Sequence, residues 1–332
     1  MDKTQVVFVG GYGRSGSTII DVLLNRVPSI VAVGEFRHLF GRALGDNELC
    51  SCSQPFRECP FWGKVLAEAF PDGVDPGYIQ HVVQRWNRVV RLPFLRFPRL
   101  MTPRMREEAQ VYHEAFAAAY HAVAKVSGAK VVVDSTKYPV HGWFLSTMPE
   151  LDLRVMLLVR DPRAVAFSWT RRRLRPEVHW EKREMPRHNV VRSAQAWNMS
   201  NDITARLAWV RKLPCRLQRY EDFVANPTEE LVRIASFALG EHVTLPADLF
   251  TRQPHLPHTI AGNPLRIGSE HVRVHEDDEW KQMPWVKRLA IILVSWPGML
   301  RYHYSLRIDV KDLRRPAAVV AISSIIVAVA LS

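Results

Sequence analysis

Cysteines, long apolar runs and acidic residues are all scarce in this chain of 332 residues. Its four cysteines are too few for the disulfide-stapled core of a small secreted protein. The N-terminal apolar run is short and has no small-residue cleavage site, so we expect no signal peptide and a cytoplasmic chain. Hydrophobic residues (47%) and charged residues (23%) occur at ordinary frequencies, which excludes long disorder.

Acidic residues are outnumbered by basic ones, and the formal net charge is +12. Such a surplus suits nucleic acid, an anionic lipid surface or a small polyanionic ligand, and it does not choose among them. Between Arg85 and Arg106, arginines interleave with aromatic residues. This pattern fits nucleic acid or lipid headgroups, but it equally fits a plain surface helix and loop over an acceptor cleft.

An apolar tail closes the sequence, at residues 314–332. About 15 uncharged residues follow Pro316, fewer than the roughly 20 that a membrane-spanning helix needs. Three interpretations stay open: a helix against a membrane or partner, a tail anchor, or a packed terminal helix. Arg314 and Arg315, which begin this segment, would suit an anionic, cytosolic membrane face.

Aliphatic runs alternate with helical patterns along the chain, which predicts an α/β fold. Strands are expected at 6–9, 130–134, 154–159 and 215–218, with a short extended piece at 30–33 and helices between the strands. We therefore expect a three-layer, P-loop-like fold with a central parallel sheet and helices on both faces, forming one domain over residues 1–310. Residues 36–62 are expected to be loop-like, and residues 64–128 to form a helical, acceptor-side lobe. Ligands of such sheets bind beyond the carboxyl ends of the strands.

The first predicted strand ends in a glycine- and serine-rich loop, Gly11 to Thr18. It follows the spacing of a phosphate-binding loop except that Ser17 stands where a nucleoside triphosphatase has lysine. Backbone N–H groups and a helix N-terminus can still cradle an anion there. The expected anion-binding residues of the loop are Gly13, Arg14, Ser15, Gly16, Ser17 and Thr18.

A second anion site is expected after the strand at 154–159. Arg160 begins the sequence Arg-Asp-Pro-Arg-Ala, and Ser168 follows about two helical turns later. With both loops, the chain resembles the sulfotransferases that use 3′-phosphoadenosine 5′-phosphosulfate (PAPS), in particular actinobacterial-type members related to the tyrosylprotein and carbohydrate sulfotransferases. The resemblance assigns the first loop to the 5′-phosphosulfate and the second site to the 3′-phosphate.

Further positions carry the same resemblance. It implies a catalytic base at Glu35 and a catalytic lysine at Lys137. We further expect Arg14 to help Lys137 stabilise charge on the leaving phosphate, and partial burial to raise the pKa of Glu35. His38 and His141 are weaker candidates for the base. The remaining donor contacts that the resemblance implies are Arg172 for the 3′-phosphate, Tyr220 near the adenine, and Asn263 and Arg266 in a closing loop.

The predicted reaction is sulfuryl transfer from PAPS to a hydroxyl on a small molecule, glycan or lipid, giving PAP, with no metal required and no nucleic-acid partner. Two alternatives stay open: a P-loop nucleotide or small-molecule kinase, which Ser17 disfavours, and a non-catalytic, membrane-associated anion-binding protein.

Cys50, Cys52 and Cys59 lie within about ten residues of one another. A loop staple or a packed thiol cluster is the favoured interpretation. Zinc is a further alternative, and it would need a fourth ligand, for which His38 is a candidate.

Overall fold

The structure is a computed structural model that describes residues 3–246, 249, 257–267 and 278–307. Its centre is a five-stranded parallel sheet in the order β2-β3-β1-β4-β5. The strands are β1 (Thr4–Gly11), β2 (Ile30–Gly34), β3 (Val131–Asp134), β4 (Leu151–Val159) and β5 (Cys215–Arg219). All four predicted strands are present, and the predicted extended piece at 30–33 forms a fifth, β2. The longest pairing joins β1 to β4 in register from Thr4 and Leu151 to Gly11 and Leu158.

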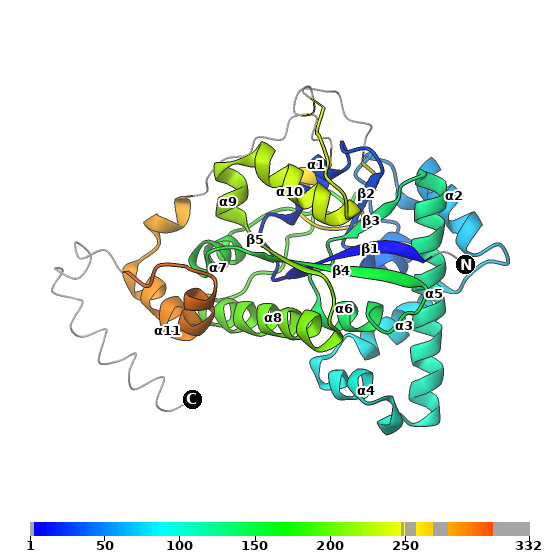
Figure 1. Cartoon of the computed structure of the whole chain (residues 1–332), viewed down its shortest axis with the longest axis horizontal. Helices are drawn as coiled ribbons and strands as arrows, with labels where there is room; N and C mark the ends of the chain where they lie inside the picture. The colour runs from blue at the N-terminus through cyan, green and yellow to red at the C-terminus, as the bar shows by residue number, and fades with distance from the viewer. Residues whose placement is uncertain (1–2, 247–248, 250–256, 268–277, 308–332) are drawn as a thin grey trace.

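Alternate residues of β1 point into two separate cores, which explains why its apolar run is uninterrupted. Val7 and Val9 pack with α1 (Ser17–Leu24) and α10 (Pro227–Leu239) on one face. Val6 and Phe8 pack on the other face with the helices below the sheet in Figure 1. The α/β, three-layer prediction is therefore confirmed.

The second face is covered mainly by helices of the lobe at residues 64–128. Figure 1 shows the long helix α5 standing at one side of the sheet, with α4 at the lower tip. The helices of this face are α2 (Pro60–Ala69), α3 (Pro76–Trp86), α4 (Leu92–Arg96), α5 (Pro103–Ser127), α6 (Pro139–Leu145) and α8 (Val190–Arg211). In the Arg85–Arg106 segment Trp86 is buried, whereas Phe97 is exposed, so only part of the basic-aromatic pattern faces solvent.

Three more helices complete the fold: α7 (Pro162–Thr170), α9 (Tyr220–Ala225) and α11 (Trp285–Arg301). Helices α8 and α11 were not predicted; they pack against each other beside the sheet (Figure 1). The loop-like prediction for residues 36–62 is wrong in part, because short helical turns at Phe36–His38 and Leu39–Ala43 are present and α2 begins at Pro60. The apolar tail lies outside the described residues, and no helix among those described is long and apolar enough to span a membrane.

Candidate active site

The loop between β1 and α1 lies at the carboxyl edge of the sheet, as predicted. Gly16 has φ +93°, and a Cβ there would lie 2.2 Å from the ring of Tyr220. A Cβ on Gly13 would lie 2.9 Å from the Trp169 ring. Glycine is therefore required at Gly16 both by its left-handed backbone and by the approach of an aromatic ring.

Arg14 also adopts a left-handed backbone, with φ 71°. Its guanidinium stacks over Trp169 at 5.0 Å from the ring centroid, and its carbonyl accepts a hydrogen bond from Arg160 Nη1 at 3.1 Å. Burial, and then the nearby Arg173, lower the pKa of Arg14 below its usual value. The two anion sites predicted from separate motifs are thus in direct contact.

Lys137 supplies a cation where the first loop lacks one. Its Nζ donates to Ser17 Oγ at 2.7 Å and to the carbonyl of Ser135 at 2.7 Å. Ser17 is the position at which a triphosphatase loop carries its own lysine. Here the ammonium group belongs to Lys137, in the loop after β3. The backbone of Lys137 is left-handed, with φ 58°.

Glu35 follows β2 and forms an ion pair with Lys137, with 3.2 Å between Oε1 and Nζ. Burial raises the pKa of Glu35, but the positive charges of Lys137 and the neighbouring Arg42 lower it by more than burial raises it. The net pKa of Glu35 therefore lies below its usual value. The predicted upward shift is therefore wrong, because the sequence does not show how many cations gather around this carboxylate.

A strap formed by residues 257–263 fixes the turn that carries Glu35. Ile260 bonds on both sides of Gly34: its N–H donates to Val33 at 2.8 Å, and its carbonyl accepts from the N–H of Glu35 at 2.8 Å. A Cβ on Gly34 would lie 2.5 Å from the Ile260 carbonyl oxygen. Farther along, the backbone N–H of Asn263 reaches Thr18 Oγ1 at 3.4 Å, so the strap also closes against the first loop.

The second rim is built by β4, α7 and α9. The Arg160 guanidinium lies over the Tyr220 ring, 4.5 Å from its centroid. Ser168 projects from α7 and is buried. The helix α7 begins at Pro162 with Asp161 as its N-cap, which accepts from Arg163 N–H at 2.8 Å.

These elements enclose one cleft of about 510 Å³. Nearly all predicted site residues line it: Gly13, Arg14, Gly16, Ser17, Thr18, Glu35, Lys137, Arg160, Ser168, Tyr220 and Asn263. Its cations are Arg14, Arg37, Arg42, Lys137, Arg160, Arg173 and Arg175, and Glu35 is the one carboxylate among the described lining residues. Arg42 and Arg175 form ion pairs with Glu48 and Glu177 behind the lining, and Lys137 pairs with Glu35. The lining still has more cations than anions, which favours a polyanionic ligand.

A sequence profile described as "Sulfotransferase family" matches residues 6–241 of this chain, which is well over half of it. The chain belongs to the sulfotransferase family. Among solved structures, the sulfotransferase domain from the Synechococcus PCC 7002 olefin synthase is similar, with 18% sequence identity and a TM-score of 0.48 over 92% of this chain and 97% of that one. No curated protein sequence matches the chain significantly.

Three predicted contacts lie outside this sulfotransferase cleft. Ser15 is buried and donates its hydroxyl within the loop, to the carbonyl of Tyr12 at 2.7 Å. Arg266 donates to the carbonyls of Thr259 and Leu49 at 2.7 and 2.8 Å, so it braces the strap.

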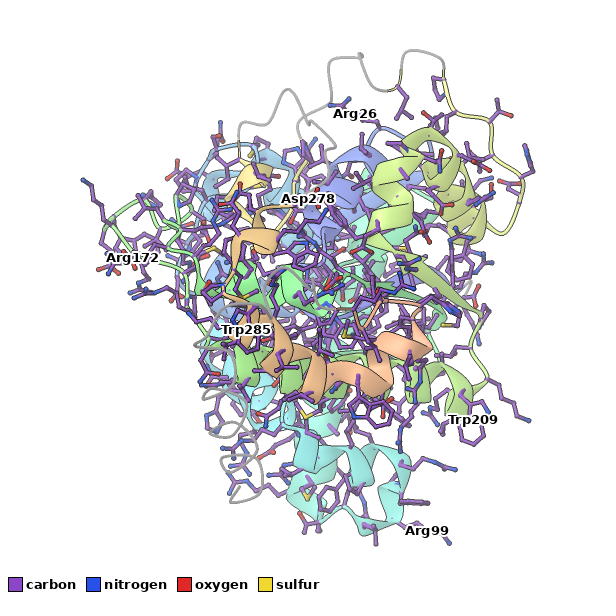
Figure 2. The ribbon with its side chains drawn as sticks, turned by 90° about the vertical axis from the view of Figure 1, so that its left-hand side faces the viewer. Arg26, Arg99, Arg172, Trp209, Asp278 and Trp285 are labelled. Atoms are coloured by element: carbon purple, nitrogen blue, oxygen red, sulfur yellow. The ribbon has the colours of Figure 1, made fainter. Side chains whose placement is uncertain are left out.

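Arg172 is the third predicted contact, and it is not among the residues that line the cleft. Its side chain is exposed and projects from the edge of the molecule (Figure 2). The helix α7 ends at Thr170, and in the segment that follows it is the next residue, Arg173, that faces the cleft. Arg173 and Arg175 line the cleft instead. Alternation along an extended segment was the signal that could have distinguished Arg172 from its neighbours.

The two histidines considered as bases are placed differently. His141 is fully buried and bonds to Asp134 at 3.0 Å, away from the cleft lining. His38 lines the cleft and lies 3.6 Å from Glu35, but burial and the nearby Arg37 lower its pKa well below the usual value. Glu35 and His38 thus both line the cleft, whereas His141 does not.

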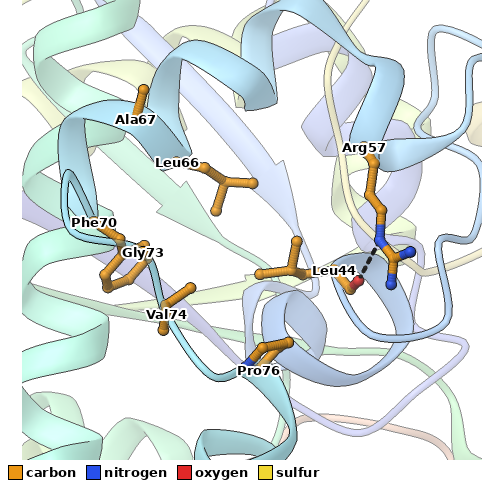
Figure 3. Close-up of a pocket in the computed structure, with 8 residues that line it drawn as sticks. All are labelled: Leu44, Arg57, Leu66, Ala67, Phe70, Gly73, Val74 and Pro76. Atoms are coloured by element: carbon orange, nitrogen blue, oxygen red, sulfur yellow. Dashed lines mark hydrogen bonds between the residues drawn. The ribbon is translucent and has the colours of Figure 1, made fainter.

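A second hollow of about 430 Å³ lies over the helical lobe (Figure 3). It is lined by Leu44, Arg57, Leu66, Ala67, Phe70, Gly73, Val74 and Pro76. The charged group among these, Arg57, donates to the carbonyls of Leu44 and Gly45 at 3.0 and 2.8 Å. Among the described residues that line the hollow none is an acid, a base or a nucleophile, so it is not a catalytic candidate.

Proposed function

We propose that the chain transfers a sulfuryl group from PAPS to an acceptor hydroxyl and releases PAP. The family supports sulfuryl transfer in general. The observation that carries the choice of donor is the pairing of two cationic sites, around Arg14 and Arg160, within one cleft. PAPS has phosphate groups at two separate positions of one nucleoside, which suits such a pair.

Each end of the cleft has a task in this proposal. Backbone N–H groups of the Gly11–Thr18 loop, with Arg14, hold the 5′-phosphosulfate. Arg160 and Ser168 hold the 3′-phosphate, with Arg173 replacing Arg172 as a nearby cation. Tyr220 offers its ring face to the adenine, although Arg160 already covers part of that ring.

The chemical step moves the sulfur from one oxygen to another. The bond between sulfur and the bridging phosphate oxygen breaks, the acceptor oxygen bonds to sulfur, and the hydroxyl proton passes to Glu35. The leaving phosphate keeps the electron pair of the broken bond, and Lys137 and Arg14 neutralise its charge. Since the step resembles phosphoryl transfer, with a loose transition state, positioning and charge neutralisation supply most of the catalysis. Side-chain cations suffice for this scheme, which calls for no metal.

The ion pair between Glu35 and Lys137 has a consequence for this step. A carboxylate with a lowered pKa is a weak base, so Glu35 gains basicity only if the cation moves away from it. The contact between Lys137 and Ser17 places the ammonium within reach of the phosphosulfate loop. We infer that donor binding draws Lys137 toward the donor and raises the pKa of Glu35 for proton transfer.

The acceptor class is a further part of the proposal. The basic lining of the cleft and the basic segment at residues 85–106 suit a glycolipid, carbohydrate or lipid-linked hydroxyl at a cytosolic membrane face. The helical lobe contributes none of the described cleft-lining residues, so its acceptor role stays a prediction.

Mass spectrometry of lipid and metabolite extracts incubated with enzyme and PAPS tests the proposal. A new species heavier by one sulfo group is expected with the wild type and is expected to fall by about 100-fold or more with Glu35→Gln, the loss typical of a general base. Equal formation by both proteins would remove Glu35 from its role. Product with ATP and Mg²⁺ but not with PAPS would favour the kinase alternative.

A further inference from the structure

Three thiols and one imidazole meet beside the strap, although they are far apart in the sequence. Cys50, Cys52 and Cys59 come from the segment before α2, and His258 comes from the strap. One ligand atom of each residue lies within 4.8 Å of all the others. The fourth member is thus His258, and the earlier candidate, His38, lies beside Glu35 instead.

The separations agree with a tetrahedron of ligands around one ion. Zinc binds sulfur at about 2.3 Å and nitrogen at about 2.0 Å, so tetrahedral geometry places two sulfurs about 3.7 Å apart and sulfur from nitrogen about 3.5 Å apart. The Sγ of Cys59 lies 3.7 Å from that of Cys52 and 3.8 Å from that of Cys50. Nδ1 of His258 lies 3.2 Å from Cys59 Sγ and 3.7 Å from Cys50 Sγ.

A disulfide staple does not account for this arrangement. All four cysteines are free thiols, and a bonded pair would bring two sulfurs to about 2.05 Å. A disulfide would also use two of the three thiols and leave no role for the imidazole. A thiol–imidazole hydrogen bond orients the ring nitrogen toward one sulfur, whereas Nδ1 of His258 lies within 3.7 Å of two sulfurs, which themselves lie 3.8 Å apart.

The surrounding contacts orient the ligands. The His258 ring stacks on Phe61, with ring centroids 4.8 Å apart and an angle of 9° between the planes. Ser51, between two of the cysteines, donates its hydroxyl to the Pro257 carbonyl and accepts from the Thr259 N–H at 2.8 Å. Both neighbours of His258 are therefore tied to the cysteine segment, which holds the imidazole beside the thiols.

We propose that Cys50, Cys52, Cys59 and His258 bind a structural Zn²⁺ ion that holds the strap in place. Four protein ligands close the coordination sphere, which is typical of structural rather than catalytic zinc. Ile260, two residues beyond His258, bonds to both sides of Gly34 and so to the N–H of Glu35. The ion thereby fixes the turn that carries the proposed base, whereas the metal-binding inference itself does not depend on the reaction.

Metal analysis of the untagged, full-length wild type tests the site directly. We expect about one zinc ion per chain, with X-ray absorption showing three sulfurs at about 2.3 Å and one nitrogen at about 2.0 Å. Replacement by Co²⁺ is expected to give a thiolate-to-cobalt charge-transfer band. A wild type with below about 0.1 zinc ion per chain after growth in zinc, or a mass two hydrogens lower from a disulfide among these cysteines, would overturn the proposal.

Variants with matched controls identify the ligands. Cys59→Ser is expected to lose zinc, whereas Cys215→Ser, which changes the exposed cysteine of β5, retains it. His258→Cys is expected to keep zinc because a fourth thiolate completes the set, and His258→Ala is expected to bind it weakly. Equal zinc content in Cys59→Ser and the wild type would contradict the assignment. If Cys59→Ser does not fold, the wild-type absorption spectrum and the His258→Cys variant still decide.

Hydrogen exchange measures how firmly the strap is held, without any assay of activity. Chelation of the wild-type ion is expected to increase exchange at the amides of Glu35 and Ile260 and to leave the strand pairing of β1 with β4 protected. Unchanged exchange at both amides after complete zinc removal would contradict the structural role.

Discussion

The cleft and the cysteine–histidine cluster lie at two ends of the same strap, yet their side chains suit ligands of opposite charge. The cleft gathers cations around an open space of about 510 Å³, whereas the cluster gathers soft, metal-ligating atoms within 4.8 Å. The first arrangement suits an anion that binds and leaves. The second suits a cation that stays, so a change in one region should have a different signature from a change in the other.

Replacement of Lys137 by Met should separate the two regions most strongly. Turnover is expected to fall by about 1,000-fold, since a buried cation at the leaving oxygen is lost. PAP affinity should fall far less, and zinc content should not change. Rate measurements on Lys137→Met and on Lys125→Met, an exposed control that pairs with Glu68 on the lobe, test this. Loss of zinc in the Lys137 variant would mean that the regions are not independent.

Arg160→Ala should weaken PAP binding by about 10- to 100-fold, because it removes charge-assisted hydrogen bonds to one phosphate. Arg172→Ala is the matched control: its side chain is exposed, and affinity is expected to change by less than about twofold. Calorimetric titration with PAP measures both. An Arg172→Ala loss as large as that of Arg160→Ala would restore the original prediction.

Gly16→Ala should weaken PAP binding by about tenfold and lower the melting temperature, because it combines a left-handed backbone with a contact of 2.2 Å to Tyr220. Gly63→Ala in α2 is the control, since no atom lies within 4 Å of the added Cβ. That control should be neutral or stabilising. Equal PAP affinity in both variants would show that the Tyr220 ring moves aside without weakening the binding of PAP.

Asp21 gives the smallest expected effect and lies between the two regions, in a small cavity also lined by Thr259 and Arg266. Burial raises its pKa from 3.8 to about 7, although the hydroxyl of Ser135 donates to it at 2.5 Å. Between these pH values the folded state holds a proton that the unfolded state has lost, so this stabilisation is lost as pH rises through about 7.

The wild type should therefore lose about 1 kcal/mol more free energy of unfolding than Asp21→Asn between pH 6 and pH 7. Urea unfolding of both proteins at the two pH values measures the difference. Parallel pH dependence in the two proteins would exclude titration of Asp21 in this range.

The parts of the site that lie within contiguous motifs could be predicted, and the parts assembled across the sheet could not. In the Gly11–Thr18 loop and the Arg160–Ser168 segment, the residues that bind together are close in the sequence, so their spacing fixes their relative positions. By contrast, Arg42, Arg175 and His258 reach their places through long-range contacts that no spacing records. The same limit explains the wrong pKa direction for Glu35, which depends on cations from several elements.

The fold, too, could be predicted only in part from the sequence. Strands β1, β3 and β4 are almost entirely buried and have clear apolar runs, so they were predicted. Helix α8 was missed because its buried face includes Ser193, Ser200, Asn201 and Thr204, which blur the helical period of apolar residues.

The central claim is that the cleft recognises a nucleotide with both a 5′- and a 3′-phosphate. Calorimetric titration of the wild type with PAP and with adenosine 5′-phosphate, which lacks the 3′-phosphate, tests it most directly. PAP is expected to bind about 10- to 100-fold more tightly, through Arg160 and its neighbours. Equal affinity for the two nucleotides would contradict the account.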